Sequence, residues 1–472
     1  MIPWHINLDG TPSRSIYSKT LSRLIVLYTK TVIVRLAQRT GHHFRAGERS
    51  LQPVFGFLKP DEGLIRPDPG TQQRLHGLES KRPANIVPIP LEECERGEKF
   101  LGMTEWLPTN GPKEFHFLVV NTMIAHRDRT PTGRLLFFAL SNDQYGYVTM
   151  TIKKAMSYKA PIYTVTPYGP SSLVYSCGND IYLHRLDMDS GGPHWLDPVT
   201  FSLRSRGTHI SVHMPLIFVT TATESLAVLR VEVEGDGDNR PSLLFHYSDE
   251  VARDGIFHLA IPEQGLILTS SKDCMVSGLW MPSERRISNS LITVFKADLP
   301  GSITRFRQLN RRTVPVETTG KQSVDGRLTD PILGSTTNGT FYQMDILDEP
   351  SWRLLRFVVN MAKRHPIISP LRDIYDPANR DAPKPHIEPS AEDKRHRHVD
   401  GDTLVRLLNR GADQILTEML EREPGDDDRV VDFDTARARQ ERFQELIVDA
   451  GFGQRNPTAV IKWIRTLLTS AI

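Results

Sequence analysis

The residues most able to do chemistry form one basic run, Lys394-Arg395-His396-Arg397-His398. Positive side chains at this density can contact the phosphates of a nucleic acid, and the same composition is typical of nuclear-targeting segments. A solvated linker is the simpler interpretation, because the acidic residues Glu392, Asp393 and Asp400 flank the run. We favour the linker and retain three side chains as a candidate basic contact patch, namely Lys394, Arg395 and Arg397.

Elsewhere the residues that bind metals or catalyse reactions lack the spacing that such sites need. Cys94, Cys177 and Cys274 are far apart and form no C-x-x-C pair, so a thiolate zinc site is not expected. Asp236-Gly237-Asp238-Asn239 lacks the distal glutamate of a calcium loop and reads better as a hairpin turn. His42-His43 has no matched partners, and no phosphate-binding glycine loop, HExxH or GxSxG occurs. We therefore predict no enzyme, no catalytic residue, no metal and no cofactor.

The bulk composition narrows the setting of the chain. The net charge is only +2 over 472 residues, so no overall field favours nucleic acid or an anionic membrane. The most apolar early run, residues 24–36, contains Lys30 and Arg35 and cannot span a bilayer, and the N-terminus lacks the pattern of a signal peptide. The sparse, unpaired cysteines are typical of a reducing compartment. We expect the nucleus, with the cytoplasm as a second location, and no membrane partner.

Short β-type runs must position any site in the first three quarters of the chain. They extend from about residue 14 to residue 346, and glycine, proline, aspartate or serine separates them. Similar runs at residues 173–176, 217–220 and 266–269 each end in a hydroxyl residue. A repeat of about 40–50 residues indicates a β-propeller. Roughly 20 to 22 runs are enough for five or six blades, whereas a β-sandwich needs only about seven to nine strands.

Within this pattern we interpret residues 24–28 and 32–36 as two strands around a turn at Tyr28-Thr29-Lys30. Asn338-Gly339 is predicted to supply the positive φ angles of a tight hairpin. We expect propeller entry strands in residues 1–36. A flexible insertion follows in residues 37–85 and contains one weak strand near residues 53–58. The β-propeller occupies residues 86–350, a helix and polar linker residues 351–397, and a helical domain residues 398–472.

The hydrophobic period changes from 2 to 3.6 after residue 350. We predict an amphipathic helix over residues 351–363, on which Trp352 is a packing anchor rather than a ligand contact. Asp400 or Asp402 can cap the next helix. Three further boundaries are predicted, a helix end or kink at Gly411, a helix from Asp434 to a stop at Gly451, and a last helix that starts at Asn456-Pro457.

The order of these elements resembles one known family. It comprises the large subunit of the damaged-DNA-binding complex, the largest subunit of the cleavage and polyadenylation specificity factor, and splicing factor 3b subunit 3. Residues 335–339 resemble the family's G-T-x-N-G, Trp352 its tryptophan near a helix start, and residues 398–404 its F-I-D-G-D-L element. Upstream, residues 117–122 resemble Y-F-V-V-G-T and residues 133–138 resemble G-R-I-x-V-F. The matched positions in the junction are Thr336, Asn338, Gly339, Trp352, Asp400, Gly401 and Asp402.

The resemblance covers nearly the whole chain, although Thr220-Thr221 replaces the Gly-Asp of many members. It implies a WD40-like β-propeller of five to seven blades with a C-terminal helical domain. It also implies a non-enzymatic scaffold that binds other proteins in a nuclear complex for pre-mRNA processing or for DNA damage and ubiquitin ligation. In full-length members, segments from near the N-terminus complete the last ring, so a chain that completes an incomplete propeller is one expected partner. Direct nucleic-acid binding is the alternative function, and a propeller hydrolase is a more remote one.

Overall fold

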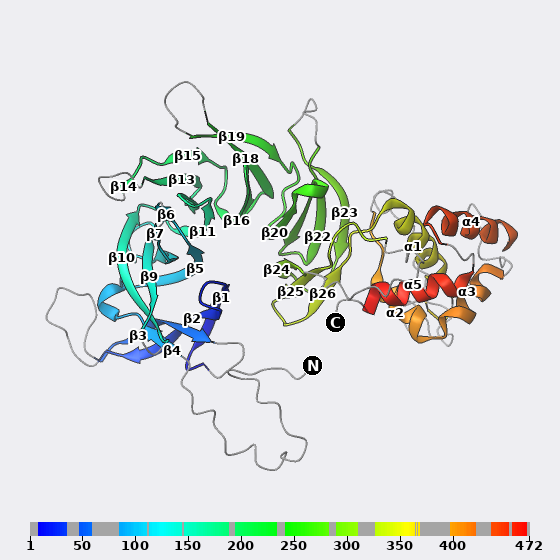
Figure 1. The fold of residues 1–472 in the computed structure, drawn as a ribbon, viewed down its shortest axis with the longest axis horizontal. Coiled ribbons are helices and arrows are strands. Elements are labelled where there is room, and N and C mark those ends of the chain that lie inside the picture. Colours follow the sequence, from blue (N-terminus) through cyan, green and yellow to red (C-terminus); the bar gives the residue numbers. More distant parts are fainter. Residues whose placement is uncertain are drawn as a thin grey trace, which may run out of the picture. The chain divides into compact units, whose positions relative to one another are not determined.

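The computed structural model describes residues 8–34, 47–58, 85–110, 113–143, 146–187, 194–233, 241–282, 289–309, 326–363, 365, 367–368, 397–421, 436–452 and 456–469. It is mainly β, with six sheets arranged as the blades of a β-propeller and helices at the C-terminal end (Figure 1). The expected fold class is therefore confirmed. The chain divides into two compact units, residues 1–256 with 283–291, and residues 257–282 with 292–472.

The first unit holds four complete blades. In strand order, the first blade is β1 (Thr11–Ser18), β2 (Arg23–Ile33), β3 (Arg49–Leu58) and β4 (Asn85–Pro88). The second is β5 (Glu98–Trp106), β8 (Phe117–Ile124), β9 (Gly133–Asn142) and β10 (Val148–Tyr158), with a small hairpin of β6 (Thr109–Asn110) and β7 (Lys113–Glu114). The third is β11 (Ile162–Tyr168), β12 (Ser172–Cys177) and β13 (Asp180–Asp187), with β14 (His194–Trp195) and β15 (Val199–Ser202) both paired to β13. The fourth is β16 (Gly207–His213), β17 (Leu216–Thr221), β18 (Leu226–Val233) and β19 (Pro241–Ser248).

The fifth blade contains β20 (Gly255–Ile261), β21 (Leu266–Ser271), β22 (Met275–Trp280) and β23 (Ile292–Asp298), and all but the first two residues of β20 belong to the second unit. The sixth contains three strands among the described residues, β24 (Ile303–Gln308), β25 (Ile332–Thr336) and β26 (Phe341–Met344). The helices of the second unit are α1 (Glu349–Ala362), α2 (Gly401–Asn409), α3 (Ala412–Glu421), α4 (Ala436–Asp449) and α5 (Pro457–Thr469). None of the helices in the described ranges is long and apolar enough to cross a membrane.

The repeated runs seen in the sequence are the second strands of three blades, β12, β17 and β21. Every residue of β12 and β21 is buried, as is all of β17 except its first residue. Nearly continuous apolar sequence is expected for strands that are covered on both faces. The hydroxyl near the end of such a strand satisfies backbone groups, since Ser176 Oγ donates to the carbonyl of Gly207 at 2.8 Å. Ser270 Oγ likewise donates to the carbonyl of Phe257 at 3.3 Å.

The first blade corrects two expectations. Residues 23–33 form the single strand β2 rather than two strands around a turn, because Tyr28 is buried and pairs in register with Val54. Residues 49–58, placed in the expected insertion, form β3, which is longer than the weak strand predicted there and pairs with both β2 and β4. His42-His43, residues 59–84 and residues 236–239 lie outside the described residues.

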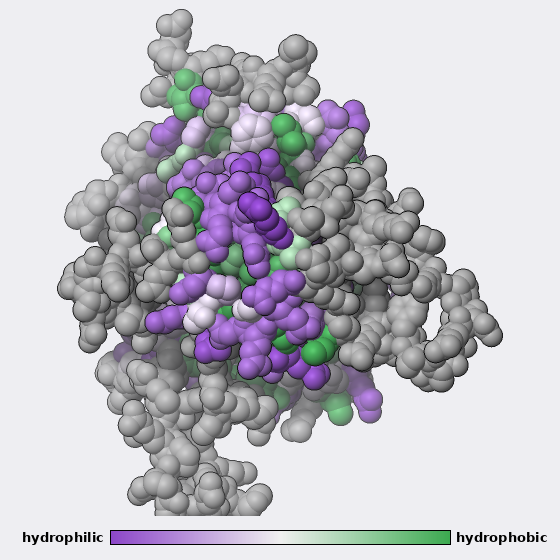
Figure 2. Space-filling model, turned by 90° about the vertical axis from the view of Figure 1, so that its right-hand side faces the viewer, coloured by the Kyte–Doolittle hydropathy of each residue, from purple (hydrophilic) through white to green (hydrophobic). Residues whose placement is uncertain are grey.

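The helices share one apolar core. Helix α1 is amphipathic as predicted, since Leu354, Leu355, Val358, Val359 and Ala362 are all buried in this core. Helices α2 to α5 contribute most of the remaining residues, including Leu407, Leu416, Phe443 and Ile464. Figure 2 shows the described surface on the helical side as mostly hydrophilic, as expected for amphipathic helices that bury one stripe each.

The helix boundaries follow the caps expected from the sequence, with one shift. Helix α1 begins two residues early, because Asp348 rather than Ser351 is the cap and accepts the Ser351 N–H at 2.8 Å. Asn456 caps α5 by accepting the Ala459 N–H at 2.8 Å. Gly411 separates α2 from α3 at φ +86°, and Gly451 ends α4 at φ +80°. The predicted helix start at Asp434 lies outside the described residues.

Candidate interaction site at the junction of the last blades and the helices

The hairpin between β25 and β26 contains three of the singled-out residues. Thr336 N–H donates to the carbonyl of Thr340 at 3.0 Å, and Gly339 N–H donates to the carbonyl of Thr336 at 3.2 Å. Asn338 Oδ1 accepts the Thr340 N–H at 3.1 Å and also accepts the Thr336 hydroxyl. Only Gly339 has a positive φ, +83°. The connection is therefore a three-residue loop with one left-handed residue, not the expected turn with two positive φ angles.

Trp352 and Arg397 meet across the junction, although 45 positions separate them in the sequence. The guanidinium carbon of Arg397 lies 6.0 Å from the centroid of the Trp352 ring, within the range of a cation–π contact. The Arg397 N–H donates to the carbonyl of Val294 on β23 at 3.4 Å. One member of the basic patch is thus engaged by α1 and the fifth blade. Lys394 and Arg395 lie outside the described residues.

Trp352 is half-buried in the first turn of α1, in keeping with the packing role expected of it. Its indole Nε1 is buried and has no hydrogen-bond acceptor among the described residues. Burying the Nε1–H donor without an acceptor costs free energy. Any favourable contribution of the Trp352 side chain must therefore come from the apolar and cation–π contacts of its ring.

His398 is partly buried next to α1. Its carbonyl accepts a hydrogen bond from the Arg356 guanidinium of α1 at 2.8 Å. Burial lowers the pKa of its imidazole below the ordinary value of 6.5, Asp400 and Asp298 act to raise that pKa, and Lys363 and Arg356 act to lower it. The neutral imidazole is therefore the form that this environment favours.

The Asp400-Gly401-Asp402 element is a helix start rather than a ligand site. Asp400 is the cap of α2, and its carboxylate accepts the Asp402 N–H at 3.0 Å and the Thr403 hydroxyl at 2.6 Å. Asp402 lies in the first turn, where a carboxylate suits the helix dipole. A Cβ at Gly401 would meet only Leu468, at an ordinary van der Waals distance of 4.0 Å, so the space around it does not require glycine.

A buried ion pair that sequence reasoning missed links the sixth blade to α5. Arg327 Nε lies 2.8 Å from Asp345 Oδ1, and their side chains are 2% and 12% exposed. Arg327 also donates to the carbonyl of Leu467, in the last turn of α5. The sequence contains no spacing signal that connects Arg327 with an aspartate after β26.

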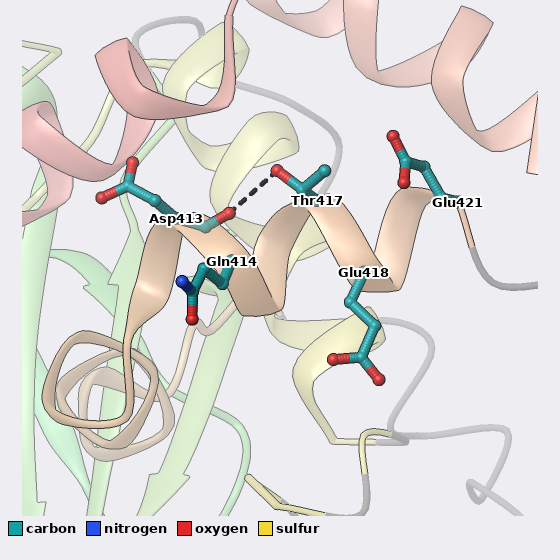
Figure 3. A pocket seen from close by; sticks show the side chains of 5 residues that line it. All are labelled: Asp413, Gln414, Thr417, Glu418 and Glu421. Carbon is teal, nitrogen blue, oxygen red and sulfur yellow. Dashed lines mark hydrogen bonds between the residues drawn. The ribbon is translucent and has the colours of Figure 1, made fainter.

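The α3 surface carries an open acidic hollow (Figure 3). The residues that line it are Asp413, Gln414, Thr417, Glu418 and Glu421. Thr417 is turned back along the helix, where its hydroxyl donates to the carbonyl of Asp413 at 2.9 Å. Glu418 Oε1 lies 3.6 Å from Nε2 of the buried His365. In the part of the chain that the structure describes, no group of three metal-binding side chains converges, here or elsewhere.

The junction thus brings Trp352 and Arg397 together, whereas Asp400 caps α2 and the hairpin residues Thr336, Asn338 and Gly339 serve their own loop. No protein-family model matches the chain, and a search among curated proteins finds no match. What the geometry defines is a class of architecture, a six-bladed β-propeller followed by α-helices.

Proposed function

We propose that the chain is a non-enzymatic scaffold that mediates protein–protein interactions in a nuclear complex, of the type that processes pre-mRNA or responds to DNA damage through a ubiquitin ligase. The β-propeller fold supports this proposal, because stacked blades build a rigid body that displays many loops and strand edges. The resemblance stated above supplies the nuclear setting and the choice of complexes.

The observation that most favours a scaffold is the structural role of the residues that the resemblance singles out. Asp400 caps a helix, Trp352 packs against Arg397, and Gly339 shapes a hairpin. Each has a local structural task, and the Arg397 contacts with Trp352 and Val294 link the segment before α2 to α1 and β23. Residues with such tasks set the position of surfaces and leave binding to other side chains.

The alternative of direct nucleic-acid binding draws on the basic run at residues 394–398. Its support is weaker, since Arg397 already contacts Trp352 and the net charge of the chain is only +2. A gel-shift series at rising salt separates the two functions, because binding through phosphate contacts weakens steeply with salt.

Affinity purification of the tagged full chain from native nuclear extract, followed by size-exclusion chromatography, tests the scaffold proposal. We expect a stable set of co-purifying proteins at a size well above that of the monomer. Recovery as a free monomer only would overturn the proposal. Binding to nucleic acid at low salt without protein partners would favour the alternative.

A further inference from the structure

A row of polar aromatic side chains crosses the boundary between the second and third blades. Its members are Tyr158 of β10, Tyr175 of β12, His184 of β13 and Trp195 of β14. We propose that this row is a redox relay, in which Trp195 passes an oxidising equivalent from the surface to Tyr175 while His184 takes up the phenol proton. The relay is an electron-transfer activity and is independent of the proposed scaffold function.

Tyr175 is fully buried, and its phenol has two hydrogen-bond partners. Its hydroxyl lies 2.8 Å from the hydroxyl of Tyr158 and 3.2 Å from Nδ1 of His184. The His184 ring also forms a hydrogen bond with the backbone of Leu196. A neutral imidazole with its proton on Nε2 accepts at Nδ1, so Tyr175 donates to His184 and Tyr158 donates to Tyr175. Tyr175 therefore has a base in place for its proton.

Trp195 connects the buried phenol with the surface. It is half-buried between two exposed residues, His194 and Leu196. The centroid of its ring lies 4.5 Å from that of His184, and the His184 ring lies 6.2 Å from the ring of Tyr175. These are the separations of aromatic rings in contact. An electron can therefore pass from Tyr175 to Trp195 across short gaps.

The charges beside the row favour movement of the oxidising equivalent inward, from Trp195 to Tyr175. Lys154 Nζ lies 5.8 Å from the centroid of the Trp195 ring, and a positive charge at that place destabilises a tryptophan radical cation. Tyr175 escapes this penalty, because an oxidised phenol is a strong acid and releases its proton. The radical that remains on Tyr175 is then neutral.

His184 is suited to receive that proton. Burial lowers the pKa of its imidazole below the ordinary value of 6.5 and Lys154 acts in the same direction, whereas the hydrogen bond to Leu196 and the charge of Asp197 raise the pKa. The ring is therefore neutral and able to accept a proton, and Leu196 and Asp197 stabilise the imidazolium once it forms. Burial also raises the pKa of Tyr175, so its phenol keeps the proton until it is oxidised.

Trp106 is the competing end point for the oxidising equivalent. Its ring centroid lies 5.7 Å from that of Trp195, and the side chain is almost completely buried. Its Nε1–H has no acceptor among the described residues. An oxidised Trp106 would keep both its proton and its positive charge in an apolar site, which is costly. Tyr175, which has a proton acceptor, is the favoured end point.

The relay needs a one-electron oxidant at the surface, such as an oxidising radical or a metal complex in solution. The oxidant removes one electron from Trp195 and is itself reduced. One electron then moves from Tyr175 to the Trp195 radical cation, while the O–H bond of Tyr175 breaks and its proton forms an N–H bond at Nδ1 of His184. The products are a neutral tyrosyl radical, an imidazolium and a restored tryptophan.

Flash photolysis of the full-length protein with ruthenium tris(bipyridine) and persulfate tests the proposal. We expect a tryptophan radical that is replaced by a neutral tyrosyl radical, both followed by optical absorption and by electron paramagnetic resonance. The replacement should be slower in heavy water, because a proton moves together with the electron. A radical that stays on tryptophan, or equal rates in ordinary and heavy water, overturns the proposal.

Three variants and one control assign the steps to residues. Tyr175→Phe should abolish the tyrosyl radical, and Trp195→Phe should lower its yield by removing the point of entry. His184→Phe keeps an aromatic ring but accepts no proton, so it should slow formation of the radical about a hundredfold, a typical contribution of a positioned base. Tyr163→Phe, at a half-buried tyrosine of β11 outside the row, should leave yield and rate unchanged.

The variants also separate a relay from an aromatic cluster that only packs. Denaturation curves show whether each variant keeps its fold, and the heavy-water comparison on the unaltered protein requires no variant at all. An undiminished tyrosyl radical in Tyr175→Phe or Trp195→Phe, or an unchanged rate in His184→Phe, would show that these side chains serve packing alone.

Discussion

The guanidinium of Arg397 rests over the indole of Trp352, with 6.0 Å between the guanidinium carbon and the ring centroid. This contact, with the Arg397 N–H bonded to Val294, fixes the end of the segment before α2 against both α1 and β23. It turns one residue of a basic run into a structural anchor.

Replacing the anchor should loosen the junction. Arg397→Ala removes the cation–π contact and should lower the free energy of unfolding by about 1 kcal/mol, whereas Arg397→Lys should recover part of it. Chemical denaturation followed by circular dichroism measures the change. Arg406→Ala, at an exposed position on α2, is the matched control. Equal effects of the two alanine variants would show that the Arg397 contact contributes nothing to stability.

The sequence left open whether Asp400 or Asp402 caps α2, and the structure assigns the cap to Asp400. Asp400 accepts two hydrogen bonds at the helix start, so Asp400→Ala should lower the free energy of unfolding by about 1 kcal/mol. Asp402→Ala loses only a favourable interaction with the helix dipole and should cost about half as much or less. Asp400→Ser should restore most of the loss. A larger effect at Asp402 than at Asp400 would contradict the assignment of the cap.

The Arg327–Asp345 pair should be costly to break from one side. Arg327→Met leaves the largely buried carboxylate of Asp345 without its charged partner, although Gln343 Nε2 still donates to it at 2.7 Å, so we expect a loss of about 3–5 kcal/mol in the free energy of unfolding. The double variant Arg327→Met with Asp345→Leu should recover a large part of that loss, because no isolated charge remains. Denaturant titration of both variants gives the comparison. A double variant as unstable as the single one would show that other contacts of Arg327 dominate.

The imidazole of His398 should make the stability of this junction sensitive to acid. Its pKa in the folded chain lies below the ordinary value of 6.5, so the unfolded chain takes up the proton first as the pH falls. Stability is therefore full above about pH 6.5 and declines as the pH falls from there through the lower folded-state pKa. His398→Gln should flatten that part of the pH profile, as followed by denaturation at successive pH values. His126, which is exposed, provides the control variant His126→Gln. An unchanged profile in the His398 variant would contradict the prediction.

The sequence predicted the repeated and local features of the fold well, because hydrophobic period and capping act over a few residues. The second strands of the blades, the apolar face of α1 and the caps at Asp400 and Asn456 all follow from such short patterns. The run through residues 23–33 was misread, since Thr29 and Lys30 resemble a turn locally and only pairing with β3 keeps them in one strand.

Long-range pairings were beyond the reach of the sequence. Nothing near Arg397 or Trp352 indicates that they meet, and nothing near Arg327 points to Asp345. Each pair forms only when the segments between its members fold. Neither the hydrophobic period nor the spacing of residues along the sequence therefore predicts it.

Two glycines that the resemblance singled out should respond in opposite ways to the same substitution. Gly339 has φ +83°, a left-handed conformation that alanine adopts with strain, so Gly339→Ala should lower the free energy of unfolding by about 1 kcal/mol. Gly401 lies at the start of α2, where a Cβ has room beside Leu468 and alanine is the better helix former, so Gly401→Ala should be neutral or stabilising. Denaturation of the two variants in parallel measures both effects. Gly339→Asn is a further check, because asparagine tolerates the left-handed region better than alanine and should lose less. A Gly401 variant as unstable as the Gly339 variant would mean that the D-G-D element needs its glycine for a reason other than the local backbone.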